Sequence, residues 1–344
     1  MHLRYQVATL AITAFLFLLP LQVWAEAPSG EFKVSQVIPL GGEGGWDYLT
    51  VDSKARRVFI SRGTHVMVVD AISGALVADI PNTPGVHGIA VVPGLNRAYI
   101  TKGNVDEVAI VDLKDFHVIG NTKTGANPDA ILYDPASKRV FSFNGRGNNV
   151  TAIEAKEGTV AGTIALNGKP EFAVADGKGQ LFVNLENTAE IVVIDSKKLE
   201  PIRRISLAPC ESPTGLALDG RHRRLFTVCR SKVMGVVDPD HSRVISTLPI
   251  GEGTDAAAFD PELQLAFSSN GRSGDLTIVH EDSPVQFKVV QTLSTALGAR
   301  TMALDAATHT LYLVTADMQP PPPDQPRGRP VPVPGTFRLL IVKQ

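Results

Sequence analysis

The sequence has none of the short motifs by which many enzyme active sites are recognised. It contains no G-x-S-x-G nucleophile elbow, no phosphate-binding P-loop, no C-x-x-C pair and no H-E-x-x-H zinc motif. Only two cysteines and eight histidines occur among the 344 residues. Motifs therefore assign the chain to no class of hydrolase, nucleotide-binding protein or metalloprotease, and the arrangement of its residues has to be considered instead.

A strong charge of one sign and a long apolar run are also lacking. The formal net charge is −2, and it becomes −3 if residues 1–25 are removed, because Arg4 is the only charged side chain in that segment. Such a balance provides no strong basic field for nucleic acid. The apolar stretch from Val7 to Leu19 is too short for a typical membrane span.

Residues 1–25 have the pattern of a secretory signal peptide. Arg4 precedes the apolar stretch, and the small or apolar residues Val23 and Ala25 suit cleavage before Glu26. The residue directly after the segment is Glu26 and not a cysteine, which argues against a lipoprotein anchor. We therefore expect a periplasmic or secreted protein that has no membrane span after the signal is removed.

In place of motifs, the sequence carries an internal repeat of short apolar runs bounded by Gly, Pro, Asn and Asp, which is typical of short antiparallel strands. Seven copies share an anchor at the end of the first run, which is an acid in all copies but the second: Asp52, Val92, Asp134, Asp176, Asp219, Asp260 and Asp305. An aromatic follows each anchor six or seven residues later: Phe59, Tyr99, Phe141, Phe182, Phe226, Phe267 and Tyr312. Successive anchors are 40 to 45 residues apart, which is the period of a four-stranded propeller blade.

The repeat predicts an all-β fold, a seven-bladed β-propeller with four antiparallel strands in each blade. A four-stranded sheet cannot bury both faces alone, so neighbouring blades stack around an axis and the repeated aromatics pack between them. The predicted blades are residues 46–85, 86–127, 128–169, 170–212, 213–254, 255–298 and 299–342, the last completed by 32–42. The last blade has only three strands of its own, so we expect the N-terminal strand to close the ring. Residues 26–344 then form a single domain.

A proline-rich insertion interrupts the seventh blade at residues 317–335, between its second and third strands. Its eight prolines argue against a ladder strand and favour polyproline II structure or disorder. The insertion is either a flap over one mouth of the channel or a surface insertion without a role.

One position of the repeat brings ionisable side chains together in this fold. Five residues before each anchor, where the innermost strands begin at the channel mouth, the blades carry Asp47, His87, Asp129, Glu171, Thr214, Asp255 and Arg300. Grouped acids have raised pKa values and can hold a divalent cation or perform acid and base catalysis. The candidate metal ligands are Asp47, Asp129, Glu171 and Asp255, and His87 is the candidate catalytic acid or base. Alternatively, these side chains pair with Arg300 or with one another and only line a water-filled channel.

Basic residues occupy the turns between second and third strands on the same face: Arg62, Lys102, Arg146, Arg230 and Arg272. Arg146 and Arg272 lie in matching Asn-Gly-Arg turns. They are candidate contacts for an anionic ligand such as a phosphate backbone or a polysaccharide. The alternative is that all five are solvated turn residues.

Other histidines map to turns on the opposite face: His117, His222, His241, His280 and His309. Only His87 joins the mouth ring, which argues against a multi-histidine copper or zinc centre. Cys210 and Cys229 both map to the mouth side of blade five. An oxidising compartment favours a disulfide between them, and two unlinked thiols are the alternative.

The periodic pattern resembles the YVTN-repeat, YncE-like β-propeller family over residues 32–342. The resemblance is carried by AYITKG at residues 98–103, GVHGIAV at 85–91 and the repeated I/V-D strand ends, while the literal YVTN tetrapeptide is replaced by YITK and FISR. It implies a seven-bladed, exported bacterial protein, mostly without assigned enzymatic activity. A member of that family has been linked to single-stranded DNA, which makes nucleic acid a candidate partner, although the charge of −3 argues against it.

These observations favour an exported binding or scaffold protein that recognises an anionic ligand at the channel mouth, using the acids of the ring and the basic turns. The second hypothesis is a hydrolase or lyase, similar to lactone-opening propellers, that uses a divalent cation held by the ring. A third is a repeat protein whose blade edges contact other envelope proteins. No cofactor is expected beyond that divalent cation, and we expect a monomer.

Overall fold

A computed structural model of the chain describes residues 1–2, 30–320 and 330–344. Most of the predicted signal peptide, residues 1–25, lies outside this part of the chain. Within the described ranges, no helix has the length and hydrophobicity of a membrane span.

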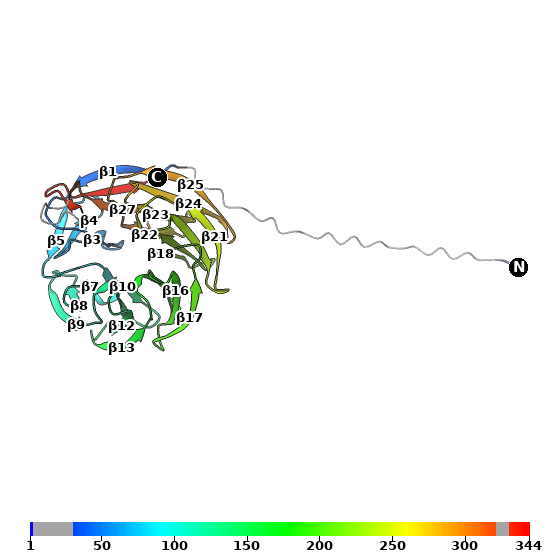
Figure 1. The fold of residues 1–344 in the computed structure, drawn as a ribbon, viewed down its shortest axis with the longest axis horizontal. Helices are drawn as coiled ribbons and strands as arrows, with labels where there is room; N and C mark the ends of the chain where they lie inside the picture. The colour runs from blue at the N-terminus through cyan, green and yellow to red at the C-terminus, as the bar shows by residue number, and fades with distance from the viewer. Residues whose placement is uncertain (3–29, 321–329) are drawn as a thin grey trace.

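Seven four-stranded antiparallel sheets are arranged around a central axis, as the repeat predicts (Figure 1). Blades one to three comprise β2 (Leu49–Asp52), β3 (Arg57–Ser61), β4 (Val66–Asp70), β5 (Leu76–Ile80), β6 (Ile89–Val92), β7 (Arg97–Lys102), β8 (Glu107–Asp112), β9 (Val118–Lys123), β10 (Pro128–Asp134), β11 (Arg139–Asn144), β12 (Asn149–Glu154) and β13 (Val160–Ala165). Blades four to six comprise β14 (Pro170–Ala175), β15 (Gln180–Leu185), β16 (Glu190–Asp195), β17 (Glu200–Ser206), β18 (Pro213–Asp219), β19 (Arg224–Cys229), β20 (Val233–Asp238), β21 (Arg243–Pro249), β22 (Thr254–Asp260), β23 (Leu265–Asn270), β24 (Asp275–Ser283) and β25 (Gln286–Ser294). A short 3-10 helix, η1 (Pro93–Leu95), connects β6 to β7.

The seventh blade joins the two ends of the chain. It comprises β26 (Met302–Asp305), β27 (Thr310–Thr315), β30 (Arg338–Lys343) and β1 (Lys33–Pro39). Strand β1 pairs antiparallel with β30, from Lys33 opposite Lys343 to Pro39 opposite Arg338. The predicted closure by the N-terminal strand is confirmed, and it removes a strand edge that would otherwise be open to pairing.

The repeated aromatics pack between blades, as predicted. Each is at most 3% exposed and lies on the second strand of its blade. Phe59 of blade one, for example, packs in one cluster with Ala98 and Ile100 of blade two. Burying one such ring contributes about 2 kcal/mol, so the repeat supplies a favourable term at every junction between blades.

The acids that end the first strands fix the following turns. Asp134 accepts backbone hydrogen bonds from Ala136 and Ser137, and Asp219 accepts the equivalent bonds from Arg221 and His222. Aspartate favours such turns because its short side chain reaches the backbone two and three residues ahead.

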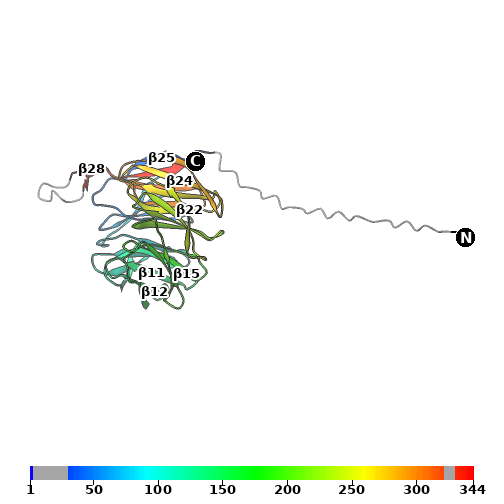
Figure 2. The same cartoon turned by 45° about the vertical axis from the view of Figure 1, so that its right-hand side comes forward.

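The proline-rich insertion contains a ladder that the sequence did not predict. Strands β28 (Met318–Gln319) and β29 (Val331–Pro332) pair antiparallel at its two ends. The expectation of no ladder strand is wrong here, because an isolated two-residue ribbon has open edges on which a proline removes no essential bond. Figure 2 shows β28 projecting from the disc of blades. The central part of the insertion lies outside the described residues.

Candidate functional site at the channel mouth

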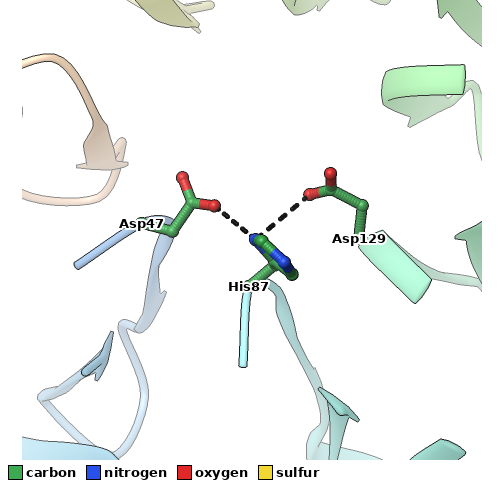
Figure 3. Close-up of side chains that lie close together, drawn as sticks. All are labelled: Asp47, His87 and Asp129. Carbon is green, nitrogen blue, oxygen red and sulfur yellow. Dashed lines mark hydrogen bonds and ion pairs between the residues drawn. The ribbon is translucent and has the colours of Figure 1, made fainter. Parts of the chain in front are cut away.

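The ring residues of blades one, two and three lie close together at the channel mouth. His87 Nδ1 lies 2.6 Å from Asp47 Oδ2 and 3.7 Å from Asp129 Oδ1. Figure 3 shows the two carboxylates pointing toward the imidazole from either side. We call Asp47, His87 and Asp129 the mouth cluster.

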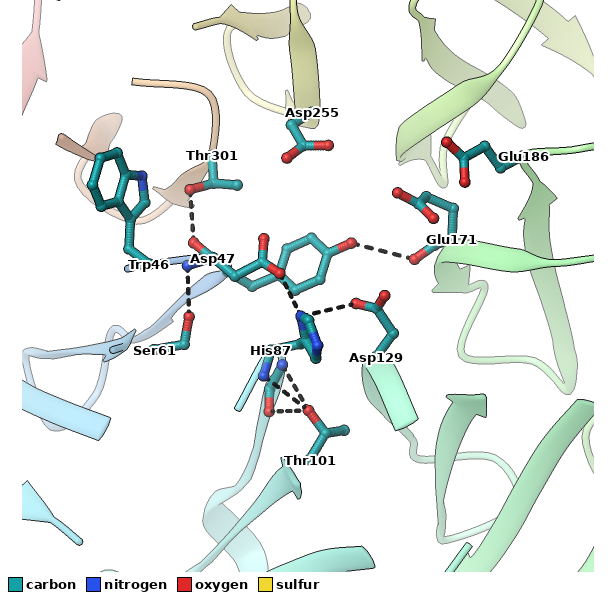
Figure 4. Close-up of polar contacts among 12 residues, drawn as sticks. Trp46, Asp47, Ser61, His87, Thr101, Asp129, Glu171, Glu186, Asp255 and Thr301 are labelled. Carbon is teal, nitrogen blue, oxygen red and sulfur yellow. Dashed lines mark hydrogen bonds and ion pairs between the residues drawn. The ribbon is translucent and has the colours of Figure 1, made fainter. Parts of the chain in front are cut away.

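Hydroxyl groups of neighbouring strands hold the backbone of this cluster. Ser61 accepts a hydrogen bond from the Asp47 amide, and Thr301 donates to the Asp47 carbonyl oxygen (Figure 4). Thr101 accepts bonds from the amides of His87 and Gly88. The side chains therefore project from a fixed backbone, which a precise binding site requires.

Arg300 links the mouth cluster to blade six. Its Nε donates to Asp255 Oδ2 at 2.9 Å, its Nη2 donates to the carbonyl oxygen of Trp46 at 2.6 Å, and Nη2 also lies 3.6 Å from Asp47 Oδ1. The guanidinium lies over the Trp46 ring at 5.6 Å, a cation–π contact. Trp46 thus forms an apolar wall beside the ionisable side chains at the mouth.

A second group of charges lies on the far side of the ring, around Glu171. Lys169 Nζ lies 3.0 Å from Glu171 Oε2 and also contacts Glu186, and Arg230 lies 2.6 Å from Glu186. Figure 4 shows Glu171 and Glu186 near each other, across the mouth from Asp47. Sequence reasoning missed Lys169 and Glu186, although Lys169 stands only two residues before a ring position.

Tyr48, also missed, crosses the channel beneath these groups. It is 8% exposed, and its hydroxyl donates to the carbonyl oxygen of Glu171, three blades away around the ring. Its ring packs on Phe172 with centroids 5.2 Å apart. Phe172 also borders a cavity of about 630 Å³ along the first strands of blades three to six, lined mostly by apolar residues, including Leu132, Val174 and Phe259.

Burial perturbs the acids of the ring. It raises the pKa of Asp255 to about 6 against the opposing charge of Arg300, and it raises the pKa of Glu171 to about 7 with a further contribution from Glu186. Burial also raises the pKa of Asp129 well above its ordinary value, although His87 opposes this shift. Shared burial of several acids makes the mouth a strongly electronegative site.

His87 is held in its charged form. Burial lowers its pKa, but the hydrogen bond that its Nδ1 donates to Asp47 and the charge of Asp129 outweigh burial and raise the pKa to about 9. At neutral pH the imidazolium therefore neutralises part of the acidic charge. The mouth then contains five acids (Asp47, Asp129, Glu171, Glu186 and Asp255) and four bases (His87, Lys169, Arg230 and Arg300), one acid in excess when all are ionised.

The basic turns separate into three groups. Arg62 is only 1% exposed, its guanidinium donates to the carbonyl oxygens of Glu43 and Gly44, and burial lowers its pKa to about 10. Lys102 pairs with Glu107, as Arg230 does with Glu186. Treating Arg62 as a solvated or ligand-contacting turn residue is therefore wrong, because the closing segment of the chain buries it.

Of the five basic turn residues, only Arg146 and Arg272 are exposed and have no ion pair among the described residues. Their turns flank the ring on blades three and six. Each turn lies against a charged residue of the mouth. A Cβ atom added at Gly145 would lie 3.7 Å from the Lys169 side chain, and one added at Gly271 would lie 2.6 Å from the Cβ atom of Arg300. The two matching turns thus stand on opposite sides of the mouth.

Thr214, the ring residue of blade five, donates to the backbone carbonyls of Val228 and Thr254 and adds no charge. Cys210 and Cys229 form a disulfide with Cα atoms 5.7 Å apart.

Three comparisons place the chain among known proteins. No protein-family model matches the sequence. The uncharacterized protein YncE of Salmonella typhi and that of Salmonella typhimurium (strain LT2) are each 28% identical to this chain over 95 residues. The match covers 27% of this chain and spans only 27% of the length of these curated relatives.

Solved structures support the fold alone. Kuenenia stuttgartiensis hydrazine synthase aligns with a TM-score of 0.70 at 16% identity, covering 79% of this chain and 92% of that chain. U3-55K aligns with a TM-score of 0.74 at 9% identity, covering 90% and 99%. With its seven blades and its closure by β1, the chain is a β-propeller protein that is distantly homologous to YncE over 27% of its length.

Proposed function

We propose that this protein is an exported binding protein whose channel mouth recognises a small ligand carrying both a positive and a negative group, such as an amino acid or a short peptide. The acids of the ring receive the cationic group. Arg146 or Arg272, on opposite sides of the mouth, receives the anionic group, which retains the anion-recognising role suggested by their turns.

The observation that carries this proposal is the excess of acid at the mouth, where five acids lie beside four bases. Burial raises the pKa values of Asp129, Glu171 and Asp255, so keeping all of these acids ionised is unfavourable without a further positive charge. A ligand ammonium group would supply the missing positive charge within a site of low dielectric, where such a pair is strongest. An anionic ligand alone would meet repulsion from the same acids.

Calorimetric titration with amino acids and dipeptides, and with matched amines and carboxylates that carry one charge, tests the proposal. We expect binding of the doubly charged compounds alone. Changing both Arg146 and Arg272 to Glu should abolish binding of these compounds. Arg243→Glu, an exposed position on β21 near the opposite face, should leave it unchanged. Binding of simple anions alone would contradict the proposal.

A second candidate, a divalent-cation-dependent hydrolase or lyase, is favoured by one observation. Ligand atoms of Asp47, His87 and Asp129 lie within 4.8 Å of one another, so they are close enough to share an ion. A metal at this position would have to displace the proton that the neighbouring acids hold on His87, so its binding should weaken as the pH falls. Elemental analysis of the protein and of an Asp129→Asn, Asp255→Asn double variant decides between the two: stoichiometric metal that the variant loses would favour the enzyme.

A further inference from the structure

A second group of acids and histidine lies on the face opposite the mouth, where blades five and six meet. Asp219 ends β18, His222 lies in the turn that follows, and Glu281 lies near the end of β24. Their ligand atoms all lie within 4.8 Å of one another. We call these three residues the junction cluster.

In the described part of the chain, two members of the junction cluster have buried polar atoms that make no hydrogen bond. The side chains of Asp219 and Glu281 are both 0% exposed. His222 Nδ1 lies 2.9 Å from Asp219 Oδ2 and 3.1 Å from Glu281 Oε1, yet it makes no hydrogen bond in the described part of the chain. Neither carboxylate oxygen of Glu281 has a hydrogen-bond partner there either. Burying a charged carboxylate that makes no hydrogen bond costs free energy, so the Glu281 carboxylate needs a bound ion or a proton to compensate its charge.

The two neighbouring arginines, Arg223 and Arg224, bind groups outside the junction cluster. Arg224 donates to the carbonyl oxygen of Pro284 and lies 3.6 Å from Asp238, while Arg223 binds Asp240.

The repeat provides an internal comparison at the junction of blades three and four. Asp134, Ser137 and Ser196 occupy the positions of Asp219, His222 and Glu281, with the same spacings of 3 and 62 residues. There the aspartate accepts hydrogen bonds from both serine hydroxyls, at 2.7 Å from Ser137 and 2.6 Å from Ser196. Two neutral donors thus satisfy one acid. At the junction of blades five and six, an imidazole from blade five and a second acid from blade six replace these donors, which creates the need for a cation.

We propose that Asp219, His222 and Glu281 form a binding site for a divalent transition metal of the zinc class, which links blades five and six. Two carboxylates and one imidazole are a ligand set that such metals accept, whereas calcium and magnesium prefer oxygen ligands alone. Metal–ligand distances of about 2.1 Å place adjacent ligand atoms about 3.4 Å apart in the tetrahedral site that zinc prefers. The observed separations of 2.9 and 3.1 Å are slightly shorter, so a small outward shift of the side chains would seat the ion.

The side chain of His222 is 25% exposed, which gives the ion access from solvent and leaves a coordination position for water. The site is separate from the mouth cluster, because β18 and β24 begin at the mouth and end on the opposite face.

Zinc titration of chelator-treated protein, followed by calorimetry and thermal unfolding, tests the inference. We expect one zinc ion per chain at the junction cluster and a zinc-dependent rise in the unfolding temperature. A His222→Ser, Glu281→Ser variant rebuilds the Asp134 arrangement. It should remain folded by circular dichroism and should bind zinc more than about 100-fold more weakly, because loss of outer contacts alone costs 10- to 100-fold.

Two controls keep the inference open to refutation. Asp129→Asn at the mouth should leave this zinc binding unchanged, and Glu281→Gln, with its small change in shape, should lose it. The inference is overturned if wild-type protein binds no zinc, if the serine variant binds it equally well, or if only Asp129→Asn reduces binding. A proton, not a metal, would then occupy the junction cluster.

Discussion

The mouth cluster and the junction cluster contain the same side-chain types but differ in how their charge is compensated. Each places a histidine Nδ1 between two carboxylates, at 2.6 and 3.7 Å at the mouth and at 2.9 and 3.1 Å at the junction. At the mouth His87 bonds to Asp47, and Arg300 contacts both Asp47 and Asp255. At the junction the imidazole Nδ1 makes no hydrogen bond among the described residues.

This difference shows that residue identity alone does not define the role of an acid cluster. Built-in bases offset all but one of the acidic charges at the mouth when every group is ionised, which leaves a place for an exchangeable ligand. The junction sets a single imidazole, that of His222, beside two fully buried acids, which suits a permanently bound ion.

The largest effect should come from removing a base at the mouth. In Arg300→Met, Asp47 and Asp255 lose their shared partner while the volume of the side chain is kept. We expect a loss of about 3 kcal/mol in the free energy of unfolding. This loss is at the low end of the usual cost of removing one partner of a buried ion pair, because the Arg300 side chain is 36% exposed. Denaturant unfolding measures the change.

Arg272→Met is the matched control, since Arg272 is exposed on the neighbouring turn and lacks an ion pair within the described residues. It should change stability by less than about 0.5 kcal/mol. Equal effects of the two substitutions would mean that Arg300 does not compensate the acids.

The next effect is a pH dependence that originates in Glu171. Its pKa is raised from 4.5 to about 7, so the folded state binds this proton more tightly than the unfolded state does. The free energy of unfolding should therefore fall as the pH rises from 4.5 through about 7 and level off above. The full shift corresponds to at most about 3 kcal/mol, and screening at the open mouth reduces this to about 2 kcal/mol.

Unfolding curves at pH 5 and pH 8 measure this difference. Glu171→Gln should remove about 2 kcal/mol of it, whereas Glu190→Gln, which only breaks a pair with Arg204 in blade four, should leave it intact. An unchanged pH dependence in Glu171→Gln would show that Glu171 is fully compensated.

The sequence predicted the fold because a propeller repeats its local rules. The acid that ends the first strand and the aromatic on the second strand recur in nearly every blade, so both blade limits and ring closure could be predicted. The ring positions followed from the same register, which is why Asp47, His87 and Asp129 were found together.

Contacts across blades could not be predicted in the same way. Tyr48 reaches Glu171 across the channel, and the chain ends bury Arg62 against Phe337, with the guanidinium 3.6 Å from the ring centroid. The pairing of Asp219 with Glu281 joins residues 62 positions apart on different blades. The repeat shows which strand a residue belongs to, but these contacts depend on side-chain direction and on how closely neighbouring blades approach.

The smallest effect should come from the blade three and four junction, where neutral donors compensate Asp134. Ser196→Ala removes the hydroxyl that donates to Asp134 Oδ2 at 2.6 Å, but the bonds from Ser137 remain. We expect a loss of about 1 kcal/mol in the free energy of unfolding, the usual cost of one buried hydrogen bond. Ser73→Ala, whose hydroxyl donates to Asp70 at an exposed turn, should cost less. A cost above about 3 kcal/mol for Ser196→Ala would mean that this one hydroxyl supplies most of the stabilisation of the buried Asp134 carboxylate. An ion bound at the junction of blades five and six would then have to stabilise Asp219 and Glu281 by at least as much.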